Sequence, residues 1–308
     1  MSKLNSSTVV LGSCLAWSSS AVIGGAIVEP GGLFTTLTIG LVAASALMLP
    51  LGLKKVSDLM DEELYLSGAL LGILMGALGL GGLMSALKFI PTSWVLGAAL
   101  GAPLFSAVIG PKEVKGVKVA AILVGYLGLV TMTGASELLP SQIAGLLLAG
   151  LGAAGLGLGL SHYRVKCRNL SRIGLAFWGI ISAAVFLLPA AIHEEAWLVN
   201  WSLGQAAAGA ALVMSALLGI AAWCWMEGRG KDAEDGPLTL GITPVLGLVF
   251  LTLATGVEAG SFEVAGLAIL GLALGLAGRK DSRETVDLAR SLEFEAQPFQ
   301  AFDDRKAA

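Results

Sequence analysis

The sequence predicts an all-α integral membrane protein whose ten transmembrane helices form two inverted repeats of five. Three observations predict this fold class: charged residues are scarce, apolar segments have membrane-spanning length, and positive charges gather between alternate segments. Of the 308 residues, 56% are hydrophobic and 13% are charged. A soluble domain carries about 25% charged residues because its surface must be solvated. This chain is therefore expected to lie in lipid.

The apolar segments are the predicted transmembrane helices. A hydrocarbon core about 30 Å thick requires roughly 20 apolar residues for each helical crossing. Runs of about this length occupy residues 9–28, 32–53, 66–87, 91–110, 117–134, 141–162, 173–192, 203–226, 238–256 and 262–278. They predict a single membrane domain over residues 1–280, followed by a charged cytoplasmic tail over residues 281–308.

The positions of lysine and arginine predict the orientation, because cytoplasmic loops retain these residues. With the N-terminus inside, sixteen of the seventeen cations near the predicted membrane ends lie on the cytoplasmic side, and Lys88 alone lies outside. We therefore expect both termini in the cytoplasm and the chain in the plasma membrane, which is the inner membrane of a bacterium.

Two distant segments are similar enough to predict an internal repeat. Residues 103–130 and 244–276 each contain a mid-helix proline, a short loop with a glutamate, and an apolar helix with recurring glycines. The repeats are expected over about 8–135 and about 140–278. Since five is an odd number, the two halves would have opposite orientations in the membrane, as in many transporters.

Glycine is abundant and regularly spaced. It provides 42 of the 308 residues, and pairs four residues apart occur at Gly72 and Gly76, Gly97 and Gly101, and Gly271 and Gly275. Small residues at this spacing share one helix face and let neighbouring backbones approach closely. The spacing suits static packing and sliding surfaces equally well.

Three stretches carry a family resemblance: "LAWSSSAVIGG" at 15–25, "SALKFIPTSWVLGAALGAPLFSAVIG" at 85–110, and "GITPVLGLVFLTLATGVEAGSFEVAGLAILGLALGLAG" at 241–278. At these residues the chain resembles the drug/metabolite transporter superfamily, in particular the EamA-type transporters with ten helices. The resemblance implies a substrate cavity near the membrane midplane, lined by the first, third, fourth, sixth, eighth and ninth helices. It also implies that the chain is a secondary transporter, and an exporter is expected.

Several polar, aromatic and proline residues inside the predicted spans are candidates for the substrate pathway. The first helix has Trp17 beside three hydroxyl groups, and a hydroxyl can equally bond to its own preceding turn. A proline inside a helix frees a backbone carbonyl one turn earlier, and Pro103 and Pro244 occupy corresponding places in the two halves. The full set of candidates is Trp17, Ser18, Ser19, Ser20, Trp94, Pro103, Gln205, Ser215, Thr243 and Pro244.

Five tryptophans, Trp94 among them, lie near predicted helix ends. Membrane interfaces are enriched in tryptophan, so a belt of interfacial side chains is the default interpretation for Trp94, Trp197, Trp201, Trp223 and Trp225. Trp178 is placed deeper and is expected to pack.

The acidic residues predict the charge of the solute. None of the 22 Asp and Glu residues lies near a predicted midplane, where a charge costs at least about 2.5–3.5 kcal/mol. A small neutral or zwitterionic organic metabolite is therefore the expected solute, moved by alternating access. Proton coupling would have to use acids at the membrane boundary, for which Glu113, Glu227 and Glu258 are the candidates.

Other classes of function have little support. The net charge of −3 and the absence of a basic, aromatic groove argue against nucleic-acid binding. No catalytic, metal-ligating or phosphate-binding pattern is visible, so no enzyme, cofactor or metal is expected. The expected partners are a small-molecule solute and the lipid bilayer. The alternative is a non-transporting membrane subunit or sensor that recruits a partner through its tail.

Overall fold

The computed structural model describes residues 6–28, 32–53, 61–108, 116–134, 138–194, 203–229, 236–256 and 259–277, and these residues form helices and short turns without a strand. The elements are α1 (Ser6–Val28), α2 (Leu33–Leu53), α4 (Glu62–Leu71), η1 (Gly72–Leu80), α5 (Gly81–Ala86), α6 (Thr92–Val108), α7 (Gly116–Met132), α8 (Pro140–His162), η2 (Tyr163–Cys167), α9 (Arg172–His193), α10 (Leu203–Arg229), α11 (Gly236–Thr255) and α12 (Ser261–Ala277). The predicted tail lies outside the described residues.

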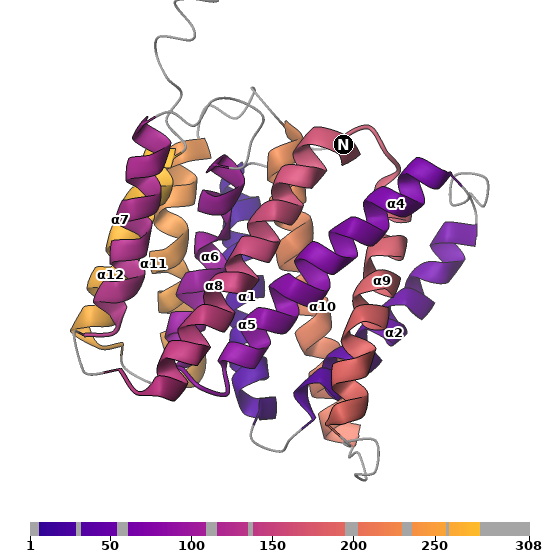
Figure 1. Ribbon diagram of the computed structural model, residues 1–308, viewed down its shortest axis with the longest axis horizontal. Helices are drawn as coiled ribbons and strands as arrows, with labels where there is room; N and C mark the ends of the chain where they lie inside the picture. The colour runs from indigo at the N-terminus through magenta and orange to yellow at the C-terminus, as the bar shows by residue number, and fades with distance from the viewer. Residues whose placement is uncertain are drawn as a thin grey trace, which may run out of the picture.

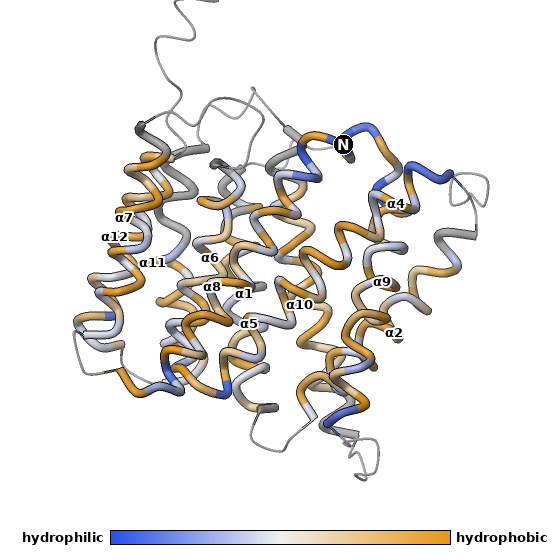
Figure 2. The backbone as a smooth tube through the Cα atoms, in the orientation of Figure 1, coloured by the Kyte–Doolittle hydropathy of each residue, from blue (hydrophilic) through white to orange (hydrophobic). Residues whose placement is uncertain are grey.

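Five of the described helical segments are long and apolar enough to cross a membrane. They are Leu33–Pro50, Glu62–Ala86, Pro140–Cys167, Arg172–His193 and Ala207–Cys224. Shorter apolar helices cover Thr92–Ser106, Val119–Met132, Pro244–Thr255 and Ser261–Ala277. In Figure 2 the middle of the helix bundle is mainly hydrophobic, and the hydrophilic stretches lie toward the helix ends. The chain is thus a membrane protein whose described residues form helices and turns only.

The charged side chains that the structure describes lie at helix ends. Each is in, or adjacent to, the first or last turn of a helical segment: Asp61, Glu62, Glu63, Lys88, Arg164, Lys166, Arg168, Arg172, Glu194 and Glu263. The centres of the described helices therefore carry no fixed charge. This distribution agrees with the high cost of a charge in hydrocarbon.

The elements α4, η1 and α5 form one continuous helix, called here the α4–η1–α5 helix. It begins earlier than the predicted span of 66–87, because the Asp61 side chain accepts hydrogen bonds from the backbone N–H groups of Glu63 and Leu64 and so caps the first turn. Its middle, η1, is a π-helix. Such wide turns within α-helices are rare and often occur at functional positions.

Glycines bring η1 against α9. A Cβ atom added to Gly72 would collide with the backbone carbonyl oxygen of Gly179, and one added to Gly76 would collide with the Cβ of Ala183. The two glycines thus face α9, and the predicted close approach of neighbouring backbones is confirmed at this pair.

Helices of the first half of the chain pack on helices of the second half. α1 packs on α10 and on α11; in the second half, α8 packs on the α4–η1–α5 helix and on α6. α9 packs on the α4–η1–α5 helix, whereas α2 packs on α10. Two further pairs, α2 with α9 and α7 with α12, lie at opposite ends of the molecule (Figure 1).

Two apolar clusters fill the interior. The larger includes side chains from α1, α6, α8, α10 and α12, and the smaller joins α2, η1, α5, α9 and α10. Gly134 and Gly256 follow α7 and α11 with φ angles of 68° and 67°, a conformation that glycine adopts without strain.

Candidate functional site

Trp17 of α1 stacks on Trp223 of α10 in the bundle interior. The two ring centroids are 4.9 Å apart and the ring planes meet at 30°. Each side chain is only 1% exposed. A Cβ added to Gly219 would lie 2.7 Å from Nε1 of Trp17, so the absence of a side chain at Gly219 gives the Trp17 ring its place against α10.

The burial of Trp223 differs from the interfacial position expected for it. α10 continues to Arg229, so Trp223 lies more than one turn before the helix end and faces α1. Trp94, also expected at the interface, is buried as well. Nearness to a predicted helix end does not determine which face of the helix a residue occupies.

Ser18 joins α1 to α11. Its hydroxyl donates a hydrogen bond of 2.9 Å to the backbone carbonyl of Gly247, and the bond is buried. A Cβ added to Gly247 would lie 2.5 Å from Cδ1 of Leu100 in α6. Three helices, α1, α6 and α11, therefore meet at Ser18, Gly247 and Leu100, which we call the three-helix crossing.

The two prolines of the predicted pathway lie close to this crossing along their helices. Pro103 follows Leu100 by three residues in α6, and Pro244 precedes Gly247 by three residues in α11. Three residues correspond to a rise of about 4.5 Å along a helix. Both prolines thus lie within about one turn of the point at which their helices meet at the crossing.

Ser19 and Ser20, the other two of the three adjacent serines, do not join this site. Ser20 is buried and donates to the carbonyl of Trp17 in its own preceding turn, at 2.9 Å. Ser19 is exposed and faces away from the contacts of Trp17 and Ser18. One of the three adjacent serines therefore links helices, and the sequence did not indicate which.

The other pathway candidates are separated from the crossing or fall outside the description. Trp94 lies in the first turn of α6, whereas Ser215 of α10 donates to the carbonyl of Leu212 in its own helix. The side chains of Gln205, Glu227 and Thr243, and residues Glu113 and Glu258 as a whole, lie outside what the structure describes.

Three buried polar atoms on α1 and α10 have no hydrogen-bond partner among the described residues. They are Oγ of Ser13, which lies one turn before Trp17, and Nε1 of both Trp17 and Trp223. A buried donor without an acceptor costs about 1–3 kcal/mol. The stacked pair therefore offers N–H groups that an acceptor atom would stabilise. In the described part of the chain, no group of three or more His, Cys, Asp or Glu could hold a metal ion.

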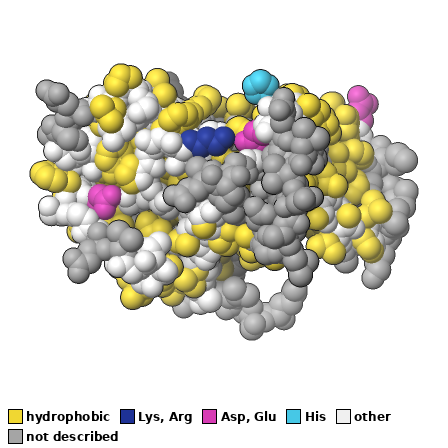
Figure 3. Space-filling view, turned by 90° about the horizontal axis from the view of Figure 1, so that it is seen from below, with side chains coloured by type: hydrophobic (Ala, Val, Ile, Leu, Met, Phe, Trp, Pro, Cys, Tyr) yellow, Lys and Arg dark blue, Asp and Glu magenta, His cyan; other side chains and the backbone are white. Residues whose placement is uncertain are grey.

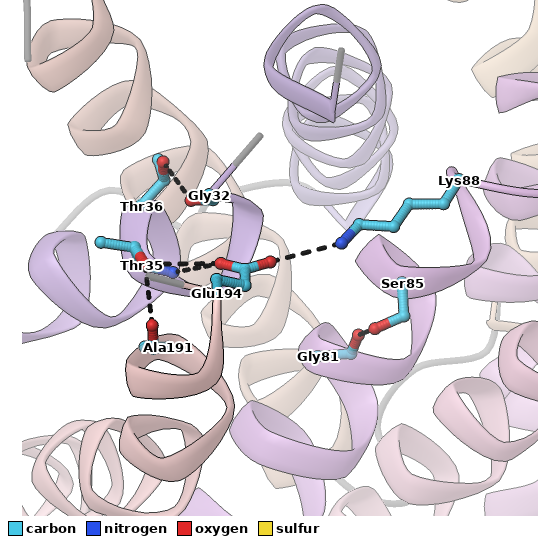
Figure 4. Close-up of polar contacts among 8 residues, drawn as sticks. All are labelled: Gly32, Thr35, Thr36, Gly81, Ser85, Lys88, Ala191 and Glu194. Carbon is cyan, nitrogen blue, oxygen red and sulfur yellow. Dashed lines mark hydrogen bonds and ion pairs between the residues drawn. The ribbon is translucent and has the colours of Figure 1, made fainter. Parts of the chain in front are cut away.

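A second polar site, which the sequence did not indicate, lies at the end of the bundle where α1, α5 and α9 finish. We call it the Lys88 end. Nζ of Lys88 is 3.3 Å from Oε1 of Glu194, and Oε2 of Glu194 accepts a hydrogen bond of 3.0 Å from the backbone N–H of Thr35 (Figure 4). Viewed from this end, a basic and an acidic side chain lie side by side (Figure 3). Lys88 and Glu194 are 106 residues apart, so no local pattern predicted their contact.

At the same end, Ser93 of α6 donates to the Glu263 carboxylate of α12. The Glu263 carboxylate also accepts a hydrogen bond of 3.1 Å from the backbone N–H of Gly260. At the opposite end, Arg164 of η2 donates to the carbonyl of Ser106 in α6, at 2.7 Å. Polar contacts thus join helices at both ends of the bundle, whereas the contacts in its middle are mainly apolar.

No protein-family model matches this sequence, and no curated protein does. A solved structure described as "Crystal structure of protein" has a similar fold, with a TM-score of 0.60. The two chains are 23% identical, and the alignment covers 94% of this chain and 98% of the other. At this identity the similarity establishes a shared fold over nearly the whole length of both chains.

Proposed function

We propose that this chain is a secondary transporter of small neutral or zwitterionic organic metabolites. In this proposal ten helices cross the membrane as two inverted five-helix repeats, as in the EamA-type drug/metabolite transporters, and alternating access moves the solute. Both termini lie in the cytoplasm of a bacterial cell, and the direction of transport is export.

The observation that carries this proposal is the correspondence of helix contacts between the halves. The main helix contacts of one half correspond to those of the other when each helix is exchanged with its counterpart. The counterparts are α1 and α8, α2 and α9, the α4–η1–α5 helix and α10, α6 and α11, and α7 and α12. For example, the packing of α1 on α10 becomes the packing of α8 on the α4–η1–α5 helix. Such pseudo-symmetry supports a mechanism in which the halves exchange conformations around one site.

We propose that this site lies at the three-helix crossing. Ser18, Gly247 and Leu100 bring α1, α11 and α6 together within about one turn of Pro103 and Pro244. Helices interrupted by proline are tolerated in a membrane where they are buried in protein or line a cavity. A change in helix geometry at either proline would alter the contacts at the crossing, so the crossing is suited to coupling helix movement to solute binding.

The charge distribution supports the solute class. The described helices carry their charged side chains only at their ends, so a solute at mid-depth meets aromatic rings, hydroxyls and backbone groups. An ion without a counter-charge would be costly there. The indole N–H groups of Trp17 and Trp223 lack acceptors among the described residues, and a carbonyl or carboxylate oxygen of a neutral or zwitterionic solute would provide one.

The experiment that tests this function is untargeted metabolite profiling of cells and medium, with and without the protein. An exporter should lower the cellular level of one chemical class and raise its level in the medium. A matched strain expressing Pro103→Ala at equal level separates transport from the mere presence of a membrane protein. If the profiles of all strains coincide under several growth conditions, the proposed function is wrong.

A further inference from the structure

We propose that the ion pair between Lys88 and Glu194 is a latch that holds the Lys88 end of the bundle closed, and that it breaks when this end opens. The proposal rests on the proposed function, because a latch requires a protein that alternates between two states. It identifies the contact that regulates access to the site from this end.

Glu194 is held in place independently of Lys88. It caps the C-terminus of α9, and its Oε2 accepts a 3.0 Å hydrogen bond from the backbone N–H of Thr35. Thr35 lies in the first turn of α2, where N–H groups lack helical partners and the helix dipole favours a negative charge. The Thr35 hydroxyl also donates to the carbonyl of Ala191 in α9, at 3.2 Å. α2 and α9 thus form one unit that presents a fixed carboxylate.

Lys88 follows the end of the α4–η1–α5 helix, whose α4 and η1 parts pack on α9. The α5 part packs along α8 and makes few contacts with α2. Nζ of Lys88 lies 3.3 Å from the Glu194 carboxylate and 5.6 Å from the ring centroid of Phe34, also in α2. Lys88 therefore links the end of α5 to the α2–α9 unit, and the link must break if this end of the helix moves away from that unit (Figure 4).

An apolar contact lies directly behind the latch. Met84, one turn before Lys88, is 1% exposed. A Cβ added to Gly24 of α1 would lie 2.7 Å from Sδ of Met84, 2.9 Å from Cδ1 of Leu87 and 3.7 Å from Cδ1 of Leu212 in α10. α1, α5 and α10 therefore touch at this level, and opening of the Lys88 end would uncover Met84.

The ion pair is suited to reversible breaking. The Lys88 side chain is 36% exposed and the Glu194 side chain 13% exposed, so water replaces part of the interaction when the pair separates. Exposed pairs of this kind change an equilibrium by about twofold to fivefold. Loss of the latch should therefore shift the balance toward the open state without abolishing the closed one.

The test measures how fast a thiol reagent labels a cysteine behind the latch, in purified protein in lipid nanodiscs. The reporter is Met84→Cys in a chain in which Cys14, Cys167 and Cys224 are replaced by alanine. A second reporter chain keeps Cys167, which is buried at the opposite end of the bundle, and replaces the other two native cysteines. His193→Gln is the matched control, because His193 is exposed and adjacent to Glu194.

Lys88→Gln and Glu194→Gln should each speed labelling of the Met84→Cys reporter by about twofold to fivefold, without speeding labelling of Cys167. Because both variants break the same contact, the double variant should be no faster than the faster single variant. His193→Gln should match the parent. If Met84→Cys does not fold, Leu212→Cys reports on the same contact from α10.

Unchanged labelling of the Met84→Cys reporter, an equal rise at both reporters, or additive effects in the double variant would overturn the latch. The labelling needs no solute, so the two proposals can fail separately. If a solute is transported but the variants leave the labelling rate unchanged, only the latch proposal is wrong. If labelling follows the expected pattern but no solute is transported, the proposed function is wrong, and the ion pair remains a breakable contact at the Lys88 end.

Discussion

The indole of Trp17 stacks on the indole of Trp223 across the contact between α1 and α10, with centroids 4.9 Å apart. Stacked aromatic pairs contribute about 0.5–1.5 kcal/mol beyond the area they bury. We expect Trp17→Leu and Trp223→Leu each to lower the apparent Tm in detergent, and the double variant to lower it by less than the sum.

Trp178 provides the control for this comparison of single and double variants. It makes edge-to-face contacts with Tyr65 and Phe177 rather than with Trp17, so Trp17→Leu and Trp178→Leu should have additive effects on the apparent Tm. Additive effects of Trp17→Leu and Trp223→Leu would show that the stacked pair has no coupling energy.

Of the glycines that the structure describes, Gly72 is the one at which an added methyl group should be least tolerated. Its Cβ would collide with the carbonyl oxygen of Gly179 and lie 2.8 Å from the carbonyl carbon. A backbone cannot move aside as a side chain can. Gly72→Ala should therefore destabilise the protein by about 1–3 kcal/mol, measured as a lower apparent Tm.

Gly150 of α8 is the matched glycine for this comparison. A Cβ there would meet nothing within 4 Å, so Gly150→Ala should leave the apparent Tm unchanged or raise it slightly, since alanine favours helices. Equal losses at both positions would mean that η1 and α9 do not approach each other as described.

Pro103 and Pro244 should affect transport more than stability. Replacing either with alanine restores a backbone donor and removes the proline ring from the preceding helical turn, near the three-helix crossing. The solute efflux rate should fall while expression and apparent Tm stay close to those of the parent. Pro189→Ala is the control, because Pro189 lies inside α9 and is exposed. Equal efflux from all three variants and the parent would reduce the two prolines to ordinary kinks.

Orientation can be measured with single cysteines and a membrane-impermeant maleimide on intact cells. Lys166 is exposed at the end of η2, and His193 is exposed at the opposite end of the bundle. With cytoplasmic termini, His193→Cys should react and Lys166→Cys should be protected. The reverse pattern would invert the proposed topology.

The lengths of the apolar segments and the positions of the charged residues were enough to place most helices. The segments expected at 141–162 and 173–192 correspond closely to α8, Pro140–His162, and α9, Arg172–His193, because charged or capping residues bound both. The segment expected at 66–87 begins earlier, since the Asp61 cap extends the helix through Glu62 and Glu63. The π-helix η1 had no sequence signal, because its width depends on packing rather than on composition.

The candidate site was predicted only in part. Trp17 and Ser18 were selected from their place in the first helix, but hydropathy does not define which helix each one faces. Trp223 was assigned to the interface although it packs on Trp17. The contact of Glu194 with Lys88 depends on how two distant helix ends meet, and no local pattern encodes that meeting.

The central claim is that the protein moves a neutral or zwitterionic solute without a charged group at mid-depth. The most direct measurement uses vesicles that contain the purified protein and are loaded with a mixture of neutral, zwitterionic, anionic and cationic metabolites. Mass spectrometry then identifies what leaves faster than from protein-free vesicles. We predict that one class of related neutral or zwitterionic solutes leaves, and that an imposed pH gradient alone does not drive its accumulation. Efflux of ions only, or no efflux from well-folded protein, would contradict this account.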